Sequence, residues 1–185
     1  AAVPEIELVL VLPSDQISIW KSLCVEYKFT VHVNLVEGGE TRFQSVKNGL
    51  SVCESDGVIA IHDGVRPLIS GALIQVCFET ALKSGSALPV VPISQSLRQK
   101  RGESDSVPID RSGMLSVQTP QCFHAGLIKA SYGQPFNDSF TDDATVFEAA
   151  GHKVTLVEGE ATNLKITTQA DLKIAQAILG MSQGG

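Results

Sequence analysis

The sequence lacks the features that mark nucleic-acid-binding and membrane proteins. No basic run exceeds the short RQKR of residues 98–101, and 14 Lys and Arg stand against 20 Asp and Glu, for a net charge of −6. A nucleic-acid surface needs clustered cations, so we expect no nucleic-acid partner. No apolar stretch approaches the roughly 20 residues that span a membrane, so we expect no membrane partner either.

The sequence also lacks paired cysteines and a recognisable export signal. Its four cysteines are scattered and form no CxxC motif: Cys24, Cys53, Cys77 and Cys122. Buried, reduced thiols are the simplest interpretation, and they are typical of cytoplasmic proteins. The N-terminal stretch AAVPEIELVLVLP has no basic region and is interrupted by acidic residues, unlike a signal peptide. We therefore expect a cytoplasmic protein.

What the sequence does contain is a regular alternation of two periodicities. With 43% hydrophobic residues among 185, the chain is long enough to form one domain, residues 1–185, around a real core. Apolar runs rich in β-branched residues predict strands at 5–13, 29–37, 57–62, 86–93 and 153–159. Apolar residues at helical spacing, with Ser70 and Gly85 as caps of the third helix, predict helices at 16–28, 40–53, 70–85, 125–131, 142–150 and 168–181. This alternation predicts an α/β fold with a largely parallel sheet covered on both faces.

The alternation breaks between Ser94 and Gln118. This segment is polar, has no helical stripe and contains turn-forming residues at Gly102 and Gly113. Short extended pieces near Leu97, at 107–109 and at 114–117 suit a β-hairpin or arm that projects from the sheet. A disordered surface loop is the alternative.

Polar residues follow the third predicted strand in the motif HDGVRP. Asp63 suits a magnesium ligand, because Mg²⁺ prefers one or two carboxylates together with phosphate oxygens. Arg66 could hold a phosphate with its planar fork of donors. An ion pair between Asp63 and Arg66 that only fixes the turn explains the motif equally well. We interpret His62 as a structural, hydrogen-bonding histidine.

Further polar motifs lie at other predicted strand and helix ends. Gly38 and Gly39, in VEGGETRFQS, either form a tight turn or let a ligand approach the free N–H groups that begin a helix. Thr141, in FTDDA, is explained by helix capping alone. Lys165, in NLKITT, is unremarkable as a surface lysine. Together, such groups at successive strand ends suit an anionic, hydroxyl-rich ligand.

The order and spacing of these motifs resemble one enzyme family over Val31 to Ile178. HDGVRP, TPQCF, FTDDA and NLKIT, with GGETRFQSV before them, resemble the 2-C-methyl-D-erythritol 4-phosphate cytidylyltransferases of the non-mevalonate isoprenoid pathway. They match the sister family, the ribitol-5-phosphate cytidylyltransferases, nearly as well. The resemblance implies a Rossmann-like, three-layer nucleotidyltransferase fold with a projecting β-arm at about 94–118.

The implied reaction transfers CMP from CTP to 2-C-methyl-D-erythritol 4-phosphate. Its products are 4-diphosphocytidyl-2-C-methyl-D-erythritol and pyrophosphate. One alternative is ribitol 5-phosphate as the acceptor; another is a catalytically silent nucleotide-binding or dimerisation module. A CTP-dependent pyrophosphate assay with both sugar phosphates separates these possibilities.

The resemblance also implies which residues bind the nucleotide and the metal. Gly39 and Ser45 fall where the family recognises the cytosine base, and Glu40 falls near the ribose. Asp63 matches the carboxylate that coordinates Mg²⁺ and approaches the sugar phosphate. Gly64 falls beside the nucleotide ribose.

The remaining implied roles concern the acceptor. The family holds the methylerythritol phosphate at the positions of Arg66, Ser96, Thr119, Thr141 and Lys165. Arg111 lies on the arm, which in the family reaches into the partner subunit, so the resemblance implies a homodimer in which Arg111 serves the neighbouring active site. Asp63, Arg111 and Lys165 are then the residues that carry catalysis.

One departure from the family is large. Its members open with a strand, a glycine-rich loop that carries an arginine, and a Pro-Lys-Gln segment that together wrap the triphosphate. Nothing in this sequence matches that region, and the first predicted strand corresponds to the family's second. A central strand would be missing, which would expose apolar edges. We therefore hypothesise that the sequence is incomplete at its N-terminus.

Overall fold

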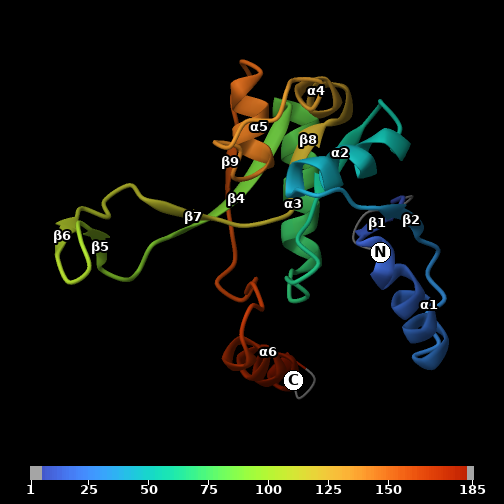
Figure 1. The fold of residues 1–185 in the computed structure, drawn as a ribbon, viewed down its shortest axis with the longest axis horizontal. Helices are drawn as coiled ribbons and strands as arrows, with labels where there is room; N and C mark the ends of the chain where they lie inside the picture. Colours follow the sequence, from blue (N-terminus) through green and yellow to red (C-terminus); the bar gives the residue numbers. More distant parts are fainter. Residues whose placement is uncertain (1–5, 183–185) are drawn as a thin grey trace.

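The computed structural model describes residues 6–182, and most of its strands lie in two separate sheets (Figure 1). In the smaller sheet, β1 (Val9–Leu12) pairs in parallel with β2 (Asn34–Glu37). The larger sheet has the order β3 (Val58–Ile61), β8 (Gln121–His124), β4 (Ser86–Pro92) and β7 (Leu115–Val117), and β9 (Leu156–Glu158) also pairs with β4. The predicted strands are thus present but mostly shorter. Glu5, which begins the first predicted strand, lies outside the described residues.

The larger sheet is mixed, so the prediction of a largely parallel sheet is wrong in part. Strand β8 runs antiparallel to both β3 and β4, and β7 runs antiparallel to β4. Within residues 6–182, only the β1–β2 and β4–β9 pairs are parallel. The reason is that β7 and β8 follow a hairpin-like excursion, which reverses the chain, whereas a helical crossover preserves its direction.

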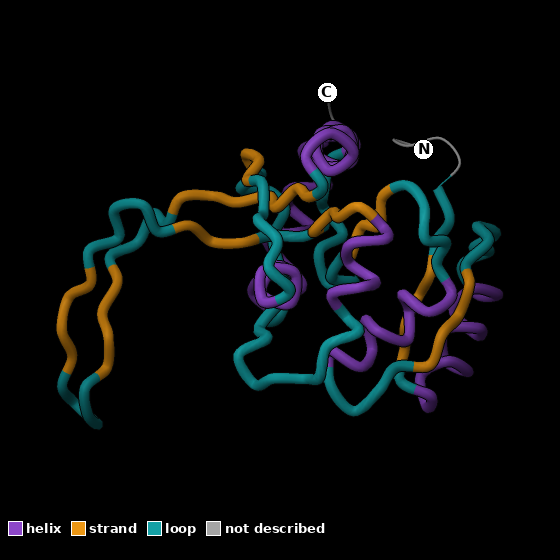
Figure 2. The backbone as a smooth tube through the Cα atoms, turned by 90° about the horizontal axis from the view of Figure 1, so that it is seen from above, coloured by secondary structure: helices purple, strands orange, loops and turns teal. Residues whose placement is uncertain are grey.

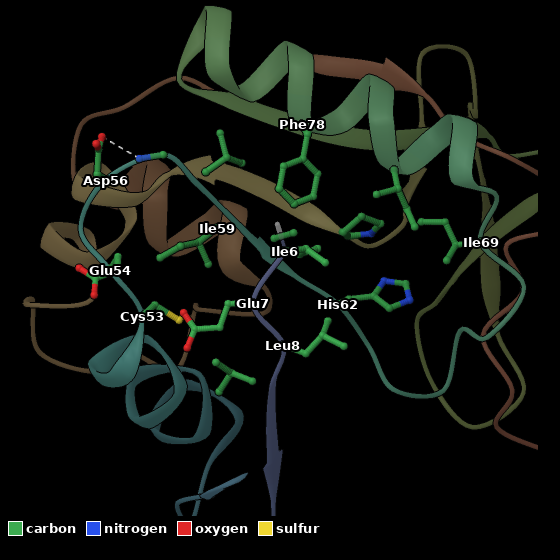
Figure 3. Close-up of a pocket in the computed structure, with 16 residues that line it drawn as sticks. Ile6, Glu7, Leu8, Cys53, Glu54, Asp56, Ile59, His62, Ile69 and Phe78 are labelled. Atoms are coloured by element: carbon green, nitrogen blue, oxygen red, sulfur yellow. Dashed lines mark hydrogen bonds between the residues drawn. The ribbon is translucent and has the colours of Figure 1, made fainter. Parts of the chain in front are cut away.

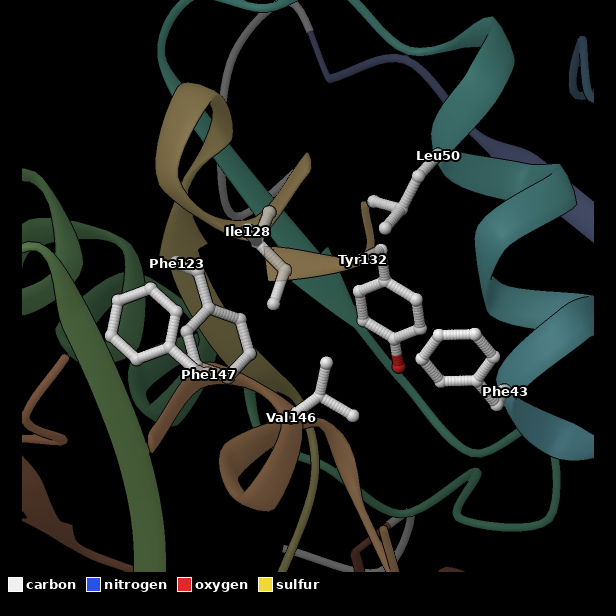
Figure 4. Close-up of a cluster of buried hydrophobic side chains, with 7 residues drawn as sticks. All are labelled: Phe43, Leu50, Phe123, Ile128, Tyr132, Val146 and Phe147. Atoms are coloured by element: carbon white, nitrogen blue, oxygen red, sulfur yellow. The ribbon is translucent and has the colours of Figure 1, made fainter. Parts of the chain in front are cut away.

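Helices cover both faces of the larger sheet, as predicted. Cys122 and Phe123 are neighbours on β8 and are both fully buried, but they point to opposite faces. Cys122 packs with Leu73 and Ala81 of α3, whereas Phe123 belongs to a cluster from three other helices (Figure 4). The helices are α1 (Ile17–Glu26), α2 (Arg42–Val52), α3 (Gly71–Ser84), α4 (Ala125–Ser131), α5 (Asp143–Ala149) and α6 (Gln169–Ser182).

Local sequence signals explain the position of α3. The hydroxyl of Ser70 accepts a hydrogen bond from the backbone N–H of Leu73, which satisfies one of the free donors at the helix start. Gly85 ends the helix with a φ of +86°, a left-handed conformation that glycine adopts without steric cost. Both predicted caps are confirmed. Among the helices described between residues 6 and 182, none is long and apolar enough to cross a membrane.

The segment between Ser94 and Gln118 forms a projecting arm rather than a disordered loop. Strands β5 (Leu97–Lys100) and β6 (Ser106–Ile109) pair as an antiparallel hairpin, with Leu97 opposite Ile109. The hairpin lies at the far end of the molecule from β1 and β2 (Figures 1 and 2). The arm returns to the sheet through β7, where Val117 pairs with Val90. The predicted hairpin is confirmed.

A gap separates β1 from β3. Within residues 6–182, β1 pairs only with β2, and β3 pairs only with β8. A cavity of about 570 Å³ lies in the gap, lined by Ile6 to Val9 on one side and by β3 and α3 on the other (Figure 3). A second cavity, of about 450 Å³, is lined by β1, β3 and α2. Two strands therefore face each other across an apolar space with unpaired edges.

Candidate functional site

The turn after β3 brings one carboxylate between two cations. The side chain of Asp63 is 18% exposed, and its Oδ2 lies 3.2 Å from Lys165 Nζ and 3.4 Å from Arg66 Nε. Arg66 makes its shorter hydrogen bond elsewhere, from Nη1 to the carbonyl oxygen of Asn163, at 2.8 Å. The Asp63–Arg66 contact is thus long, and it is not the main interaction of either residue.

The cations around Asp63 control its ionisation. Partial burial favours the neutral acid and acts to raise the pKa of Asp63. The hydrogen bond and charge of Lys165, with the charges of Arg42 and Arg66, act in the opposite direction and prevail, so the pKa lies below its usual value. Asp63 is therefore a carboxylate at neutral pH.

Segments far apart in sequence hold this turn in place. Thr119 is buried, and its hydroxyl oxygen accepts from the backbone N–H of Asp63 at 3.0 Å. The same oxygen lies 3.0 Å from Nδ1 of His62, whose Nε2 lies 3.0 Å from the carbonyl oxygen of Arg66. Since a carbonyl only accepts, Nε2 carries the proton, and Thr119 donates to Nδ1. The hydrogen-bonding role predicted for His62 is confirmed.

The segment around Lys165 is fixed to the same turn by its backbone. The N–H of Ile166 donates to the carbonyl oxygen of Val65 at 2.8 Å, and Asn163 is fully buried. The side-chain amide of Asn163 donates to the carbonyl oxygen of Thr119 at 2.9 Å. Lys165 is 49% exposed, but its ammonium group is directed at Asp63 and is not simply a solvated surface charge.

A second turn, before α2, carries the residues predicted to bind the base. The hydroxyl of Ser45 accepts from the backbone N–H of Gly39 at 3.1 Å and donates to the carbonyl oxygen of Thr41 at 3.0 Å. A Cβ atom at position 39 would overlap the side chain of Gln44, so only glycine fits this turn. Thr41 and Gln44 form a reciprocal capping box. Glu40 is exposed and makes no side-chain hydrogen bond within the described chain.

The two turns face one cavity. Ser45, Asp63 and Gly64 all line the space of about 450 Å³ between β1, β3 and α2. Arg42 lines it as well, although no motif in the sequence identified it as a site residue. One feature of the sequence could have identified Arg42. It is the first residue of the helix that follows Gly38 and Gly39, and a side chain in that position lies beside the turn.

Thr141 lies at the start of α5, but it does not cap that helix. The cap is Asp142, whose Oδ1 accepts from the backbone N–H of Thr145 at 2.9 Å. The interpretation of Thr141 as a capping residue is therefore wrong. Its exposed hydroxyl makes no hydrogen bond with the rest of the described chain, and it remains available to a ligand.

The structure does not bring Ser96 and Arg111 to the other predicted site residues. Both are exposed and lie on the arm, where Arg111 donates to the carbonyl oxygen of Ser94. Within residues 6–182, no hydrogen bond or ion pair joins either residue to Asp63, Arg66 or Lys165. A single chain thus assembles only part of the predicted acceptor site.

Cations from separate segments converge on one strand-end carboxylate beside a glycine-containing turn, an arrangement that suits transfer between two phosphates. On fold and site together, the chain is a nucleotidyltransferase with a Rossmann-like architecture. The model of the 2-C-methyl-D-erythritol 4-phosphate cytidylyltransferase family matches residues 2–181. The chain belongs to that family.

Individual relatives agree with this assignment. The 2-C-methyl-D-erythritol 4-phosphate cytidylyltransferase of Bacteroides fragilis is 46% identical over 175 residues, which are 95% of this chain and 80% of that protein. That of Bacteroides thetaiotaomicron is 45% identical over 94% of this chain and 79% of its own length. The fold is similar to the crystal structure of the 2-C-methyl-D-erythritol 4-phosphate cytidylyltransferase from Thermus thermophilus, with a TM-score of 0.78. The two sequences are 32% identical, and the match covers 93% of this chain and 81% of that chain.

Proposed function

We propose that this chain transfers CMP from CTP to 2-C-methyl-D-erythritol 4-phosphate. The observation that carries the proposal is the ionised Asp63 held between Arg66 and Lys165, in a chain whose relatives are named for this activity. These relatives support methylerythritol phosphate as the acceptor; they do not support ribitol 5-phosphate or a silent module. The proposal places the enzyme in the cytoplasm, where the four free cysteines of the chain would stay reduced.

The reaction needs positioning and charge neutralisation more than a reactive side chain. A phosphate oxygen of the acceptor attacks the α-phosphorus of CTP, and the bond from that phosphorus to the β-phosphate oxygen breaks, so that pyrophosphate leaves. Both reactants are anions that repel each other. Arg66 and Lys165 hold positive charge at the strand ends where the acceptor phosphate is proposed to bind, and Thr141 offers it a free hydroxyl.

The proposal includes a Mg²⁺ ion held by Asp63. The two cationic contacts of Asp63 both go to Oδ2, and Oδ1 accepts no hydrogen bond from the described residues. One free carboxylate oxygen fits Mg²⁺, which is bound through one or two carboxylates and completes its shell with substrate phosphates and water. When bound, the ion would neutralise charge on the phosphates.

We also propose that the arm joins two chains in a homodimer. Ser96 and Arg111 lie on the arm, and within the described residues neither has a hydrogen bond or ion pair to Asp63. The base of the arm exposes Met114, Leu115 and Val117, each about two-fifths exposed. In such a dimer, Arg111 would complete the acceptor site of the partner. This arrangement would explain why a polar hairpin interrupts the α/β alternation.

The proposal also includes one further strand between β1 and β3, which would carry the triphosphate-binding loop. Its support is the pair of facing, unpaired strand edges and the two cavities that lie between them. Such a strand would complete one continuous sheet. Intact mass of the purified protein tests this part: a stable, folded protein of 19.7 kDa with the gap unfilled would contradict it.

A pyrophosphate-release assay tests the activity. Purified full-length protein is incubated with CTP, Mg²⁺ and either methylerythritol phosphate or ribitol 5-phosphate, and the cytidylyl product is identified by mass. We expect pyrophosphate release with methylerythritol phosphate. Preference for ribitol 5-phosphate, or CTP binding without turnover of either acceptor, would overturn the proposed function.

A further inference from the structure

An ion pair between the half-exposed Arg42 and a buried carboxylate links α2 to α5. Asp143, the first residue of α5, is fully buried, and its two carboxylate oxygens accept from Nη1 and Nη2 of Arg42 at 2.9 and 2.6 Å. Its Oδ1 also accepts from the hydroxyl of Tyr132 at 2.6 Å. Because the guanidinium fork and the carboxylate are both planar, this paired contact fixes orientation as well as distance.

The pair connects the two ends of the candidate site. Arg42 is the first residue of α2 and follows directly on the turn that contains Gly39. Asp143 lies two residues after Thr141, whose hydroxyl is free. Arg42 also lines the same cavity as Ser45 and Asp63. Relative to the proposed reaction, one end of the pair is on the nucleotide side and the other is on the acceptor side.

The acceptor end has a second anchor. Gln121 of β8 donates from its side-chain amide to Asp142 at 2.9 Å and accepts from the backbone N–H of Ala144 at 2.8 Å. With the capping hydrogen bond of Asp142, these contacts fix the first turn of α5 to the sheet without Arg42.

The nucleotide end is anchored only to the smaller sheet: the backbone N–H of Gly38 donates to the carbonyl oxygen of Leu12 on β1 at 2.8 Å. Within residues 6–182, Arg42 makes the only side-chain hydrogen bonds from this turn and the first turn of α2 to the part of the chain that follows β3. The hydrogen bonds of Thr41, Gln44 and Ser45 are all internal to the turn, so they fix its shape but not its place. Phe43 also packs on Tyr132 at the end of α4, with ring centroids 4.7 Å apart, and this contact holds α2 through apolar packing and not through a hydrogen bond.

We propose that Arg42 is a positioning residue for the nucleotide: through Asp143, it fixes the turn of Gly39 and Ser45 relative to Asp63 and Thr141. This inference rests on the proposed function. Because only the nucleotide end depends on Arg42, its loss has an asymmetric effect. CTP binding weakens, whereas binding of the acceptor does not change.

Three variants test the asymmetry. Arg42→Lys keeps the charge but loses the paired contact. Arg42→Gln combined with Asp143→Asn removes both charges together, so that no unpaired carboxylate is left buried. This double variant keeps the test possible if Arg42→Lys does not fold. Lys47→Gln is the matched control: it removes one cation from the same helix, and within the described residues Lys47 has no hydrogen bond or ion pair to α5.

The readouts are the KM for each substrate, kcat per folded molecule, and the Kd for CTP by calorimetry. Both Arg42 variants are expected to raise the KM and the Kd for CTP by about tenfold, while kcat and the KM for the acceptor stay within about twofold. Lys47→Gln should leave all four values within about twofold of wild type. A purely structural ion pair would lower the amount of folded protein without separating the two KM values.

The outcomes for Arg42 and for the proposed function are distinct. If the Arg42 variants and Lys47→Gln bind CTP equally well, the positioning role is wrong. If wild type binds CTP but releases no pyrophosphate, the proposed function is wrong, and the comparison of Kd values still decides the role of Arg42. If wild type binds no CTP, both are overturned.

Discussion

The turn after β3 and the arm contribute to the same proposed acceptor site, but they are built in opposite ways. Asp63 and Arg66 are held by contacts to Thr119, Asn163 and Lys165, which come from segments distant in sequence. Ser96 and Arg111 lie on the exposed arm, and within residues 6–182 neither has a hydrogen bond or ion pair to the Asp63 turn. One half of the proposed site is therefore preformed in a single chain, and in the proposed dimer the other half would come from the partner chain.

The strongest test of the preformed half removes its central charges. Asp63→Asn and Lys165→Ala should each lower turnover at least about tenfold, roughly 1.4 kcal/mol of barrier, because each removes charge that positions or neutralises phosphates. The measurement is pyrophosphate release at saturating CTP and acceptor. Melting temperature serves as the control for folding, and turnover near the wild-type value in either variant would remove that residue from the mechanism.

A subunit-mixing experiment tests whether the arm serves the partner. Arg111→Ala and Asp63→Asn should each be nearly inactive alone. After exchange of subunits in an equal mixture, half of the dimers would be mixed, and each would contain one site with both residues intact. We expect about one quarter of the wild-type activity.

The same experiment distinguishes the two possible placements of Arg111. If Arg111 serves its own subunit, every site in the mixture carries a defect, and activity stays at the level of the separate variants. A monomeric protein at working concentrations would give the same result and would contradict the dimer.

Thr141 tests a smaller contribution at the edge of the preformed half. Thr141→Val should raise the KM for the acceptor about tenfold, because a hydrogen bond to a charged phosphate is lost. Since the hydroxyl has no partner in the described chain, the free energy of unfolding should change by less than about 0.5 kcal/mol. Thr141→Ser keeps the hydroxyl and should behave like wild type; an equal loss in both variants would exclude this role.

The smallest expected effect concerns stability and pH. Because the pKa of Asp63 is lowered from 3.8 in the folded protein, its ionised form stabilises the fold above that value, and this contribution is lost as the pH falls through the lower, folded pKa. The difference in free energy of unfolding between wild type and Asp63→Asn should be constant above about pH 5 and shrink in more acid solution. If the difference in free energy of unfolding grew as the pH falls, the pKa of Asp63 would be raised in the folded protein and not lowered.

The sequence predicted those elements that are stabilised by contacts between residues close together in the chain. The caps of α3 and the hairpin of β5 and β6 depend on residues close in sequence, and both are present as predicted. Strand β8 was not predicted, because its four residues begin with a glutamine and gain their burial from β3 and β4 on either side. The antiparallel direction of β7 and β8 likewise depends on the path of the arm.

In the candidate site, too, the residues marked by their local sequence were predicted, and those that depend on distant partners were not. Asp63 and Arg66 were identifiable because a charged turn follows an apolar strand. Arg42 was not identified, since its partner Asp143 lies 101 residues away, and nothing in the local sequence of either residue specifies the other. The capping role assigned to Thr141 failed because two neighbouring residues can both cap, and only the backbone geometry selects Asp142.

The arm enters and leaves the sheet through neighbouring strands, where Pro92 of β4 lies opposite Leu115 of β7. A short turn could join these two positions, so the hairpin can be lengthened, shortened or replaced without shifting the strands that carry it. The proposed dimerisation surface would thus be separable from the strands that support it. In the proposed dimer, changes to the tip of the hairpin could alter which chains associate, provided that Ser96 and Arg111 keep their places on the arm.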